Sequence, residues 1–359
     1  MVSLLALSTH PSSNGQRFRI ETWAPYLASN GIRVETFPFA DGRLENLLYQ
    51  KGKLGQKALH TGLAYTRYTS VLRRSRLYDG LFIYREATPI GPAIFERLLT
   101  KRRMPLIYDI DDPIFMPFSN PNNPITARLR DFDKMRRIAA RSSVTICINE
   151  LIANEVRQFA PKVAIIPNAI DLDRYTCRDW TTVPRRPTLG YSGSFSTMRQ
   201  LEDIRKPLEV LAQDHDCRLE VHGGPLPFVV PGIENVQTPW TLDAEIETLH
   251  RFDVGLAPAP EDEWNRYKSF LKVILYMSVG VPVIASRVGS PTQIIRDGEN
   301  GFLASGEEEW LHKLRLLVSN PDLRRSLGVA GRQTIERDFA LSTQLPRVLD
   351  IFTKALATR

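Results

Sequence analysis

The stretch Thr188-Leu189-Gly190-Tyr191-Ser192-Gly193-Ser194-Phe195-Ser196-Thr197 decides the fold class of this 359-residue chain. Residues 188–192 predict a buried strand, residues 193–197 a Gly/Ser loop, and residues 200–213 a helix. A strand, a small-residue loop and a helix in that order open a βα unit of a parallel sheet. Such a loop lets backbone N–H groups approach an anion at the helix N-terminus, although a plain tight turn explains the same residues.

The same alternation of strands and helices is predicted on both sides of this stretch. Strands are expected at residues 2–8, 33–37, 80–84, 104–109, 144–149, 164–166, 218–221, 253–257 and 281–285, and a further helix at 19–29. The turn cluster Pro167–Asp171 separates the two halves. The sequence therefore predicts an α/β protein with two Rossmann-like domains, whose parallel sheets face a central cleft where a ligand binds beyond the carboxyl ends of the strands.

Composition excludes several classes of protein. Apolar residues make up 43% of the chain and charged residues 24%, which is typical of a globular protein. No run reaches the roughly 18 apolar residues of a membrane-spanning helix, and the apolar N-terminus is too short for a signal peptide. The three cysteines form neither a metal-binding spacing nor a disulfide framework, so we expect a cytoplasmic protein with reduced thiols and no metal site.

The positive charge is concentrated in the first half of the chain. The net charge is +7, and residues 51–103 alone hold 12 basic and 3 acidic side chains. A basic surface attracts phosphates, acidic lipid headgroups or nucleic acid, although a solvated face without a partner is an equal interpretation. No motif of a nucleic-acid-binding family accompanies it, so we expect no nucleic-acid partner.

Two lysines are the strongest candidates for chemistry. Lys268 and Lys272 are four residues apart on a predicted apolar helix and are expected to share one face. Two ammonium groups at the start of a buried helix need an anionic partner, because an unpaired buried cation is costly. A diphosphate fits, and cations there would stabilise the charge that grows on a leaving diphosphate. Two solvated lysines are the alternative.

A second candidate region lies in the first half. Asp109, Asp111 and Asp112 follow a predicted strand, and such carboxylates can act as acid or base, bind hydroxyls or hold a divalent ion. Helix capping and ion pairing with nearby arginines are the alternative. The loop His10–Gly15, followed by Arg17 and Arg19, is a candidate anion-binding loop or a solvated loop.

These features together resemble the group-1 glycosyltransferases of the GT-B fold, which are retaining and use nucleotide sugars. Residues 166–171 resemble the family's interdomain "PNG(V/I)D" element, and residues 190–197 resemble its "GWSGS..T" donor loop. Residues 264–283 are similar to a branch that reads "W.RGK..FKLL(Q/E)YMA.G.PV", and Glu308-Glu309-Trp310 and Gly331-Arg332 fit its C-terminal pattern. The resemblance spans nearly the whole chain and is strongest after residue 165.

The resemblance implies a domain organisation and a set of roles. Residues 1–170 would bind the acceptor, residues 171–340 the nucleotide sugar, and residues 341–359 would form a helix that crosses back to the first domain. The resemblance implies that Lys268 and Lys272 are catalytic groups and that Gly193, Ser194, Asp262, Gly289 and Ser290 bind the substrate. The position of Asp111 and Asp112 after a strand, rather than the resemblance, makes them further catalytic candidates. In the same way the loop residues Gly15, Arg17 and Arg19 are further candidates for substrate binding. The nucleotide sugar is a substrate, so neither a cofactor nor a metal is expected.

Two positions depart from the family's pattern. The family usually has two glutamates eight positions apart, where this chain has Tyr267 and Leu275. Because leucine cannot hydrogen-bond a hydroxyl, the nucleotide ribose must be held elsewhere or donor binding must be weak. A histidine that the family often has near its first-domain site is replaced here by the aspartates at 109–112.

The resemblance implies transfer of a sugar from a nucleotide-diphospho-sugar to an acceptor hydroxyl with retention. A glycan or lipid-linked acceptor in bacterial cell-envelope polysaccharide or glycolipid synthesis is expected, with peripheral attachment at the inner face of the cytoplasmic membrane. The alternative is a weakly active or inactive GT-B protein that serves as a non-catalytic partner or sugar-binding module. A sugar-nucleotide epimerase is disfavoured because no matching catalytic set is found.

Overall fold

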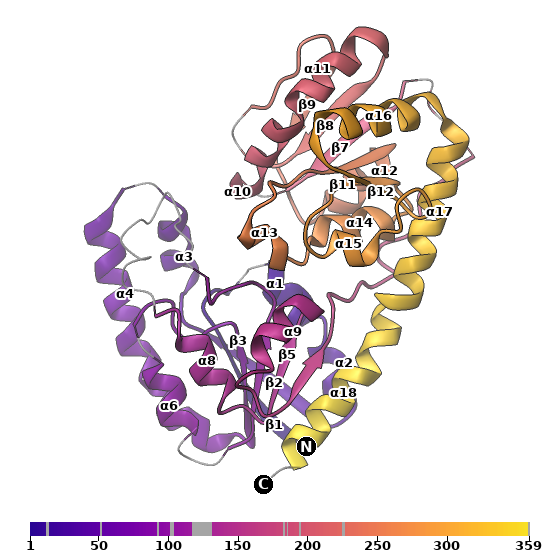
Figure 1. Ribbon diagram of the computed structural model, residues 1–359. Helices are drawn as coiled ribbons and strands as arrows, with labels where there is room; N and C mark the ends of the chain where they lie inside the picture. Colours follow the sequence, from indigo (N-terminus) through magenta and orange to yellow (C-terminus); the bar gives the residue numbers. More distant parts are fainter. Residues whose placement is uncertain are drawn as a thin grey trace. The chain divides into compact units, whose positions relative to one another are not determined.

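The protein is described by a computed structural model that divides into two compact units (Figure 1). Unit 1 comprises Met1–Asn168 and Gln344–Arg359, and unit 2 comprises Ala169–Thr343. The sequence predicts domain boundaries after residues 170 and 340. The structure describes the chain except for residues 12–13, 51, 92, 101–103, 117–130, 182–183, 185, 194, 225–226 and 358–359.

Unit 1 is built on a six-stranded parallel sheet with the order β2-β1-β3-β4-β5-β6. Its strands are β1 (Val2–Ser8), β2 (Ile32–Pro38), β3 (Gly80–Tyr84), β4 (Leu106–Ile110), β5 (Val144–Cys147) and β6 (Val163–Ile165). Every residue of β3, β4 and β5 is buried. Strands covered on both faces have continuous apolar runs rather than an alternating pattern, which explains their sequences.

Helices flank this sheet. They are α1 (Asn14–Gln16), a π-helical turn (Arg17–Glu21), α2 (Ala24–Ser29), α3 (Gly42–Tyr49), α4 (Leu54–Tyr68), α5 (Ser70–Arg74), α6 (Ile94–Thr100), α8 (Lys134–Ala139) and α9 (Glu150–Val156), with a 3-10 turn at Ser75–Leu77. The helix predicted over 19–29 is thus a π-helical turn and a separate short helix. Pro25 explains the break, because its ring fits only the first turn of a helix.

The last helix of the chain, α18 (Leu341–Ala357), contributes to the core of unit 1. Phe352 is fully buried and meets Phe82 of β3 and Trp23 edge-on, with ring-centroid distances of 5.3 Å and 6.3 Å. Arg347 donates to the carbonyl of Ile165 at 2.9 Å. The core of unit 1 therefore includes residues of α18 that lie more than 180 positions downstream of β6.

Unit 2 has a second six-stranded parallel sheet, with the order β12-β11-β10-β7-β8-β9. Its strands are β7 (Thr188–Ser192), β8 (Arg218–His222), β9 (Glu234–Thr238), β10 (Val254–Ala257), β11 (Val283–Ser286) and β12 (Phe302–Ala304). Its helices are α10 (Phe195–Met198), α11 (Arg205–Asp214), α12 (Glu245–Arg251), α13 (Glu263–Tyr267), α14 (Leu271–Ser278), α15 (Pro291–Ile294), α16 (Gly306–Ser319) and α17 (Pro321–Asp338), with a 3-10 segment at Arg199–Ile204. The two parallel sheets with flanking helices confirm the predicted fold class.

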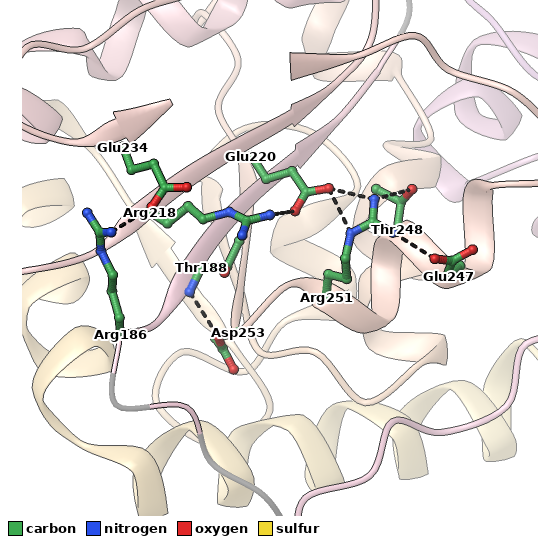
Figure 2. Close-up of polar contacts among 9 residues, drawn as sticks. All are labelled: Arg186, Thr188, Arg218, Glu220, Glu234, Glu247, Thr248, Arg251 and Asp253. Carbon is green, nitrogen blue, oxygen red and sulfur yellow. Dashed lines mark hydrogen bonds and ion pairs between the residues drawn. The ribbon is translucent and has the colours of Figure 1, made fainter. Parts of the chain in front are cut away.

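Separate sets of polar contacts lie in the same part of the unit 2 sheet (Figure 2). Glu220 of β8 is buried and accepts from Arg218 at 2.9 Å and from Arg251 at 2.6 Å. Asp253, just before β10, accepts from the backbone N–H of Thr188, the first residue of β7, at 2.8 Å. Arg218 and Thr188 are the first residues of their strands, and Asp253 directly precedes β10. The carboxyl ends of the same strands carry the candidate site.

Candidate functional site

The two candidate lysines lie at a junction between two short helices rather than on one helix. Helix α13 ends at Tyr267, and α14 begins at Leu271. Between them Lys268 is extended, and Phe270 has a left-handed backbone with φ of 48°. The prediction that Lys268 and Lys272 share one helix face is therefore wrong, because a left-handed residue interrupts the helix. Their ammonium groups nevertheless lie near enough for the charge of Lys268 to lower the pKa of Lys272.

Lys272 points at the end of strand β7. Its ammonium donates to the hydroxyl of Tyr191 at 2.8 Å and lies 3.9 Å from the centre of that ring. Burial lowers the pKa of Lys272 well below its ordinary value, and the neighbouring Lys268 lowers it further. Among the described residues, no carboxylate forms an ion pair with either lysine. Lys272 is thus a partly buried cation whose contacts are with the hydroxyl and the ring of Tyr191. Such a cation is suited to bind an anion from outside the chain.

Gly193 brings the donor-loop candidate next to this lysine. A Cβ atom on Gly193 would lie 2.7 Å from the hydroxyl of Tyr191 and 2.7 Å from that of Thr197, so only glycine fits. The N–H of Gly193 already donates to the carbonyl of His222 at 3.0 Å. This bond occupies the Gly193 amide in the structure, and the predicted approach of Gly193 to a diphosphate stays a prediction. Ser194 lies outside the described residues.

Gly289 and Ser290 fix the helix junction from the other side. Gly289 has a φ of +67°, and a Cβ atom there would lie 2.4 Å from the carbonyl oxygen of Asn265. Ser290 donates from its hydroxyl to the carbonyl of Lys268 at 2.7 Å. The structure thus brings both residues to the lysine junction, where they hold the backbone that presents Lys268.

Asp262 is the N-cap of α13. Its side chain accepts from the backbone N–H of Asn265 at 2.7 Å and from the side-chain amide of Asn265 at 2.9 Å. The side chain of Asp262 is exposed, so the cap leaves its second oxygen accessible. The predicted contact of this carboxylate with a sugar hydroxyl stays a prediction. Leu275 on α14 is buried, with 6% of its surface exposed, and offers no group to a ribose.

In unit 1 the candidate residues gather at the carboxyl ends of β3 and β4. A Cβ atom on Gly15 would lie 1.7 Å from the hydroxyl of Tyr84 and 2.6 Å from a carboxylate oxygen of Asp111. The Tyr84 hydroxyl donates to that same oxygen at 2.7 Å. Two predicted site residues, Gly15 and Asp111, are therefore neighbours, and Tyr84 connects them.

Arg85 engages both predicted catalytic carboxylates of unit 1. Its Nη2 lies 2.8 Å from Asp111 Oδ2 and 2.6 Å from Asp112 Oδ2, and its Nε contacts Asp111 Oδ1. Its backbone is left-handed, with φ of 60°. Burial favours the neutral form of Asp111, but Arg85 and the Tyr84 hydroxyl outweigh it and lower the pKa of Asp111. This geometry matches the ion-pairing alternative, and proton transfer by these carboxylates stays a prediction.

The two candidate arginines of unit 1 have different surroundings. Arg19 is fully buried, pairs with Asp109 at 2.8 Å and donates to the carbonyl of Pro167 at 3.2 Å. A fully buried guanidinium with these partners cannot contact a substrate, so the prediction for Arg19 is wrong. Burial raises the pKa of Asp109 to about 6 despite that pair. The guanidinium carbon of Arg17 lies 4.5 Å from the centre of the Phe18 ring, and its role in binding stays a prediction.

The described residues form neither a metal-ligand cluster nor a helix that could span a membrane. No group of three or more histidine, cysteine, aspartate or glutamate side chains in the described part could hold a metal ion. None of the helices formed by the described residues is both long and apolar enough to cross a membrane.

Comparison with known proteins bears on the same segment of unit 2. Residues 186–320, which include β7, both lysines, Gly289 and Ser290, match the family model "Glycosyl transferases group 1". The resemblance to the group-1 glycosyltransferases is therefore confirmed. The sequence is also 23% identical over 264 residues to a D-inositol 3-phosphate glycosyltransferase from a Nocardioides strain, which covers 62% of this chain and 57% of that protein.

Two further comparisons extend the group-1 resemblance. A trehalose synthase from Pyrococcus horikoshii is 29% identical over 103 residues, a quarter of either protein. The chain thus aligns with less than two thirds of the length of these curated relatives. The crystal structure of HepE from Anabaena, solved with UDP and glucose, matches 99% of this chain and 100% of its own with a TM-score of 0.71 at 16% identity. That likeness shows a shared fold.

Three residues of the candidate site were missed by the sequence analysis. Tyr191 holds Lys272, Arg85 holds the paired aspartates, and Tyr84 connects Asp111 to Gly15. Tyr84 and Arg85 lie at the end of a predicted strand, and that position could have drawn attention to them. Tyr191 is 81 residues from Lys272, so nothing local indicated their contact.

Proposed function

We propose that this protein is a glycosyltransferase that moves a sugar from a nucleotide-diphospho-sugar to an acceptor hydroxyl with retention of configuration. The family match over residues 186–320 supports the class of enzyme. The complex of the similarly folded HepE with UDP and glucose supports a nucleotide-sugar donor. The further statements on retention, donor and acceptor rest on the family resemblance and on the geometry of the lysine junction.

The observation that carries the proposal is the position of Lys272. Its ammonium is partly buried and lacks a carboxylate partner among the described residues. It contacts Tyr191, which touches the Gly193 turn at the end of β7. Ligands of parallel sheets bind at the carboxyl ends of the strands. A diphosphate there would supply the missing negative charge, and Lys268 would add a second cation.

The proposed chemistry requires no enzyme nucleophile. As the bond from the anomeric carbon to the diphosphate breaks, negative charge grows on the leaving oxygens and Lys272 and Lys268 stabilise it. The anomeric centre becomes oxocarbenium-like, and the acceptor hydroxyl attacks it from the face that the diphosphate leaves. An oxygen of the leaving phosphate takes the proton of that hydroxyl. The nucleotide diphosphate and the glycosylated acceptor are the products.

We further propose an acceptor and a location. The acceptor is a glycan or a lipid-linked sugar of bacterial cell-envelope polysaccharide or glycolipid synthesis, and unit 1 binds it. The basic excess of residues 51–103 supports attachment at the inner face of the cytoplasmic membrane, because each cation near an anionic surface adds attraction. The enzyme would then meet a lipid-linked acceptor at the surface where that acceptor resides.

Replacing Lys272 with alanine tests the proposal. We expect turnover with the preferred nucleotide sugar to fall about 100- to 1,000-fold, because one electrostatic group aimed at a developing charge contributes that much. The matched control is Lys206→Ala, which removes an exposed lysine of unit 2 that pairs with Glu307. Transfer by the Lys272 variant at nearly the wild-type rate would show that the lysine has no such role.

A thermal shift with a panel of nucleotides separates catalysis from the alternative. The buried Leu275 at a position where the family usually has glutamate is the observation that favours a non-catalytic partner or sugar-binding module. A transferase is stabilised by UDP, GDP or another sugar nucleotide, since a ligand that binds only the folded state raises its stability. The absence of a shift with every nucleotide would favour the alternative.

A further inference from the structure

Helix α4 turns an uncharged apolar face to solvent. Lys57, Ala64 and Tyr68 of α4 are buried, whereas Leu59 and Leu63 are 62% and 56% exposed. Leu59 and Leu63 are four residues apart, so their side chains lie next to each other on the outer face. The outer face of a helix that packs on a protein core is normally charged or polar.

The exposed residues of this helix carry almost no charge. From Leu54 to Thr66 the exposed residues are Leu54, Gly55, Gln56, Ala58, Leu59, Gly62, Leu63 and Thr66. The one lysine in that range, Lys57, is turned inward and donates to the carbonyl of Gln50 at 2.6 Å. Burial of the outer face of α4 in a less polar environment would therefore remove almost no charge from water.

The surroundings of this face are cationic. Among the described residues from 41 to 100, the exposed charged side chains are one carboxylate, Asp41 at the N-cap of α3, and the cations Arg43, Lys53, Arg67, Arg73, Arg74, Arg76 and Arg97. The other acidic residues of that range, Glu45, Asp79, Glu86 and Glu96, are buried or half-buried. A surface on which seven exposed cations outnumber one exposed carboxylate is complementary to an anionic partner.

A hollow between α3 and α4 adjoins the leucines. It has a volume of about 410 Å³ and is lined by Arg43, Asn46, Leu47, Gln50, Gln56, Leu59 and His60. The lining combines a cation with several amide groups, which together suit an anionic headgroup of modest size. Leu59 belongs both to the hollow and to the apolar face, so polar and apolar surfaces meet there.

We propose that the α3–α4 surface, made of Arg43, Lys53, Gln56, Leu59, His60 and Leu63, docks on an anionic lipid bilayer. In this mode Leu59 and Leu63 enter the boundary between headgroups and acyl chains while Arg43 and Lys53 meet lipid phosphates. This docking extends the proposed function, because it would bring the enzyme to a membrane acceptor. Only that purpose rests on the proposed function, and the docking itself does not. A soluble polyanion would need the cations but not the exposed leucines.

Sedimentation of the full-length protein with vesicles tests the docking surface. Wild type is expected to bind vesicles of phosphatidylglycerol and phosphatidylcholine at low salt, to bind them less at high salt, and to bind pure phosphatidylcholine weakly. Arg43→Gln with Lys53→Gln should weaken binding to the anionic vesicles about 25-fold, about fivefold for each cation. Leu59→Gln with Leu63→Gln should weaken it at both salt concentrations.

Matched variants on unit 2 control for general effects of charge and apolarity. Arg325→Gln removes an exposed arginine and Leu316→Gln an exposed leucine, and both should bind vesicles as wild type does. All four variants replace exposed side chains, so their nucleotide-induced thermal shifts should equal that of wild type. That readout separates loss of docking from failure of the proposed function, because vesicle binding does not require donor binding.

Three results would overturn the docking proposal. They are no binding of wild type to anionic vesicles at low salt, equal binding to neutral vesicles, and unchanged binding by both double variants. Heparin serves as a soluble polyanion for comparison. If the arginine–lysine variant loses heparin binding and vesicle binding equally, and the leucine variant loses neither, the surface binds a soluble polyanion instead. Vesicle binding with no response to any nucleotide would contradict the proposed function alone.

Discussion

Tyr191 controls the environment of Lys272. It accepts a hydrogen bond from the ammonium at 2.8 Å and donates its own proton to the carbonyl of Thr197 at 2.7 Å. Its ring also faces the ammonium, a contact that favours the charged form. Burial and Lys268 favour the neutral form and lower the pKa of Lys272. Under the proposed function, the balance between these effects decides at which pH the lysine attracts a diphosphate.

Replacing Tyr191 with phenylalanine keeps the ring and removes the hydrogen bond. Loss of an acceptor for the ammonium should lower the pKa of Lys272 further. The affinity for the diphosphate is present below that pKa and is lost as pH rises through it, so the loss should begin at lower pH in the variant. Nucleotide titrations over a pH series measure this shift. Tyr276→Phe is the control, since its hydroxyl accepts from the N–H of Ser192 instead.

The break between α13 and α14 is the element that presents the two lysines. Asp262 begins α13, Phe270 interrupts the helix with a left-handed backbone, and Gly289 packs against the carbonyl of Asn265. A continuous helix over these residues would have placed Lys268 and Lys272 one turn apart on one face. The break instead leaves Lys268 extended and starts a new helix that aims Lys272 at β7.

Asp262 is expected to matter for stability and for catalysis in different ways. Asp262→Ala removes the N-cap and should lower the free energy of unfolding by about 1 kcal/mol, whereas Asp262→Asn keeps the cap and should cost little. If the free carboxylate oxygen binds a sugar hydroxyl, Asp262→Asn should raise KM for the donor although the fold is intact. Denaturant titrations and donor kinetics on both variants measure the two effects. If the Asp262→Asn variant has the wild-type KM for the donor, Asp262 serves only as the N-cap of α13.

At the scale of the whole molecule, the chain returns to unit 1 after it has completed unit 2. Helix α17 ends at Asp338 within unit 2, and α18 places Phe352 in the core of unit 1 against Trp23 and Phe82. The core of unit 1 therefore needs both ends of the chain. The segment between them folds around its own sheet.

Phe352→Ala should destabilise unit 1 selectively. Removal of a fully buried phenylalanine costs about 3–5 kcal/mol through lost transfer free energy and a residual cavity. Chemical denaturation should show this loss, while the thermal shift caused by a nucleotide at unit 2 should persist. Thr353→Ala, at the neighbouring exposed position, should change stability little. A stability equal to wild type would mean that α18 contributes nothing to the core.

The local sequence predicted elements that are buried or bounded by strong turn signals. The apolar runs at 2–8, 80–84 and 188–192 are strands with these bounds because a strand covered on both faces must be apolar throughout. The edge strands β9 and β12 were missed. Glu234–Thr238 is half exposed and polar, and Phe302–Ala304 is only three residues long. The other two edge strands, β2 and β6, were predicted, so an edge position alone does not hide a strand.

For the candidate site, the sequence determined the residue types, and tertiary structure decided which of them meet. The small residues around Gly193 and the Gly289–Ser290 pair are visible as motifs because each meets a local backbone requirement. The two lysines stand out because the helix they adjoin is otherwise apolar. Three contacts of the site join residues between 26 and 90 positions apart: Lys272 with Tyr191, Arg19 with Asp109, and Arg85 with Asp111. Such contacts depend on how strands and helices pack, and no local pattern specifies them.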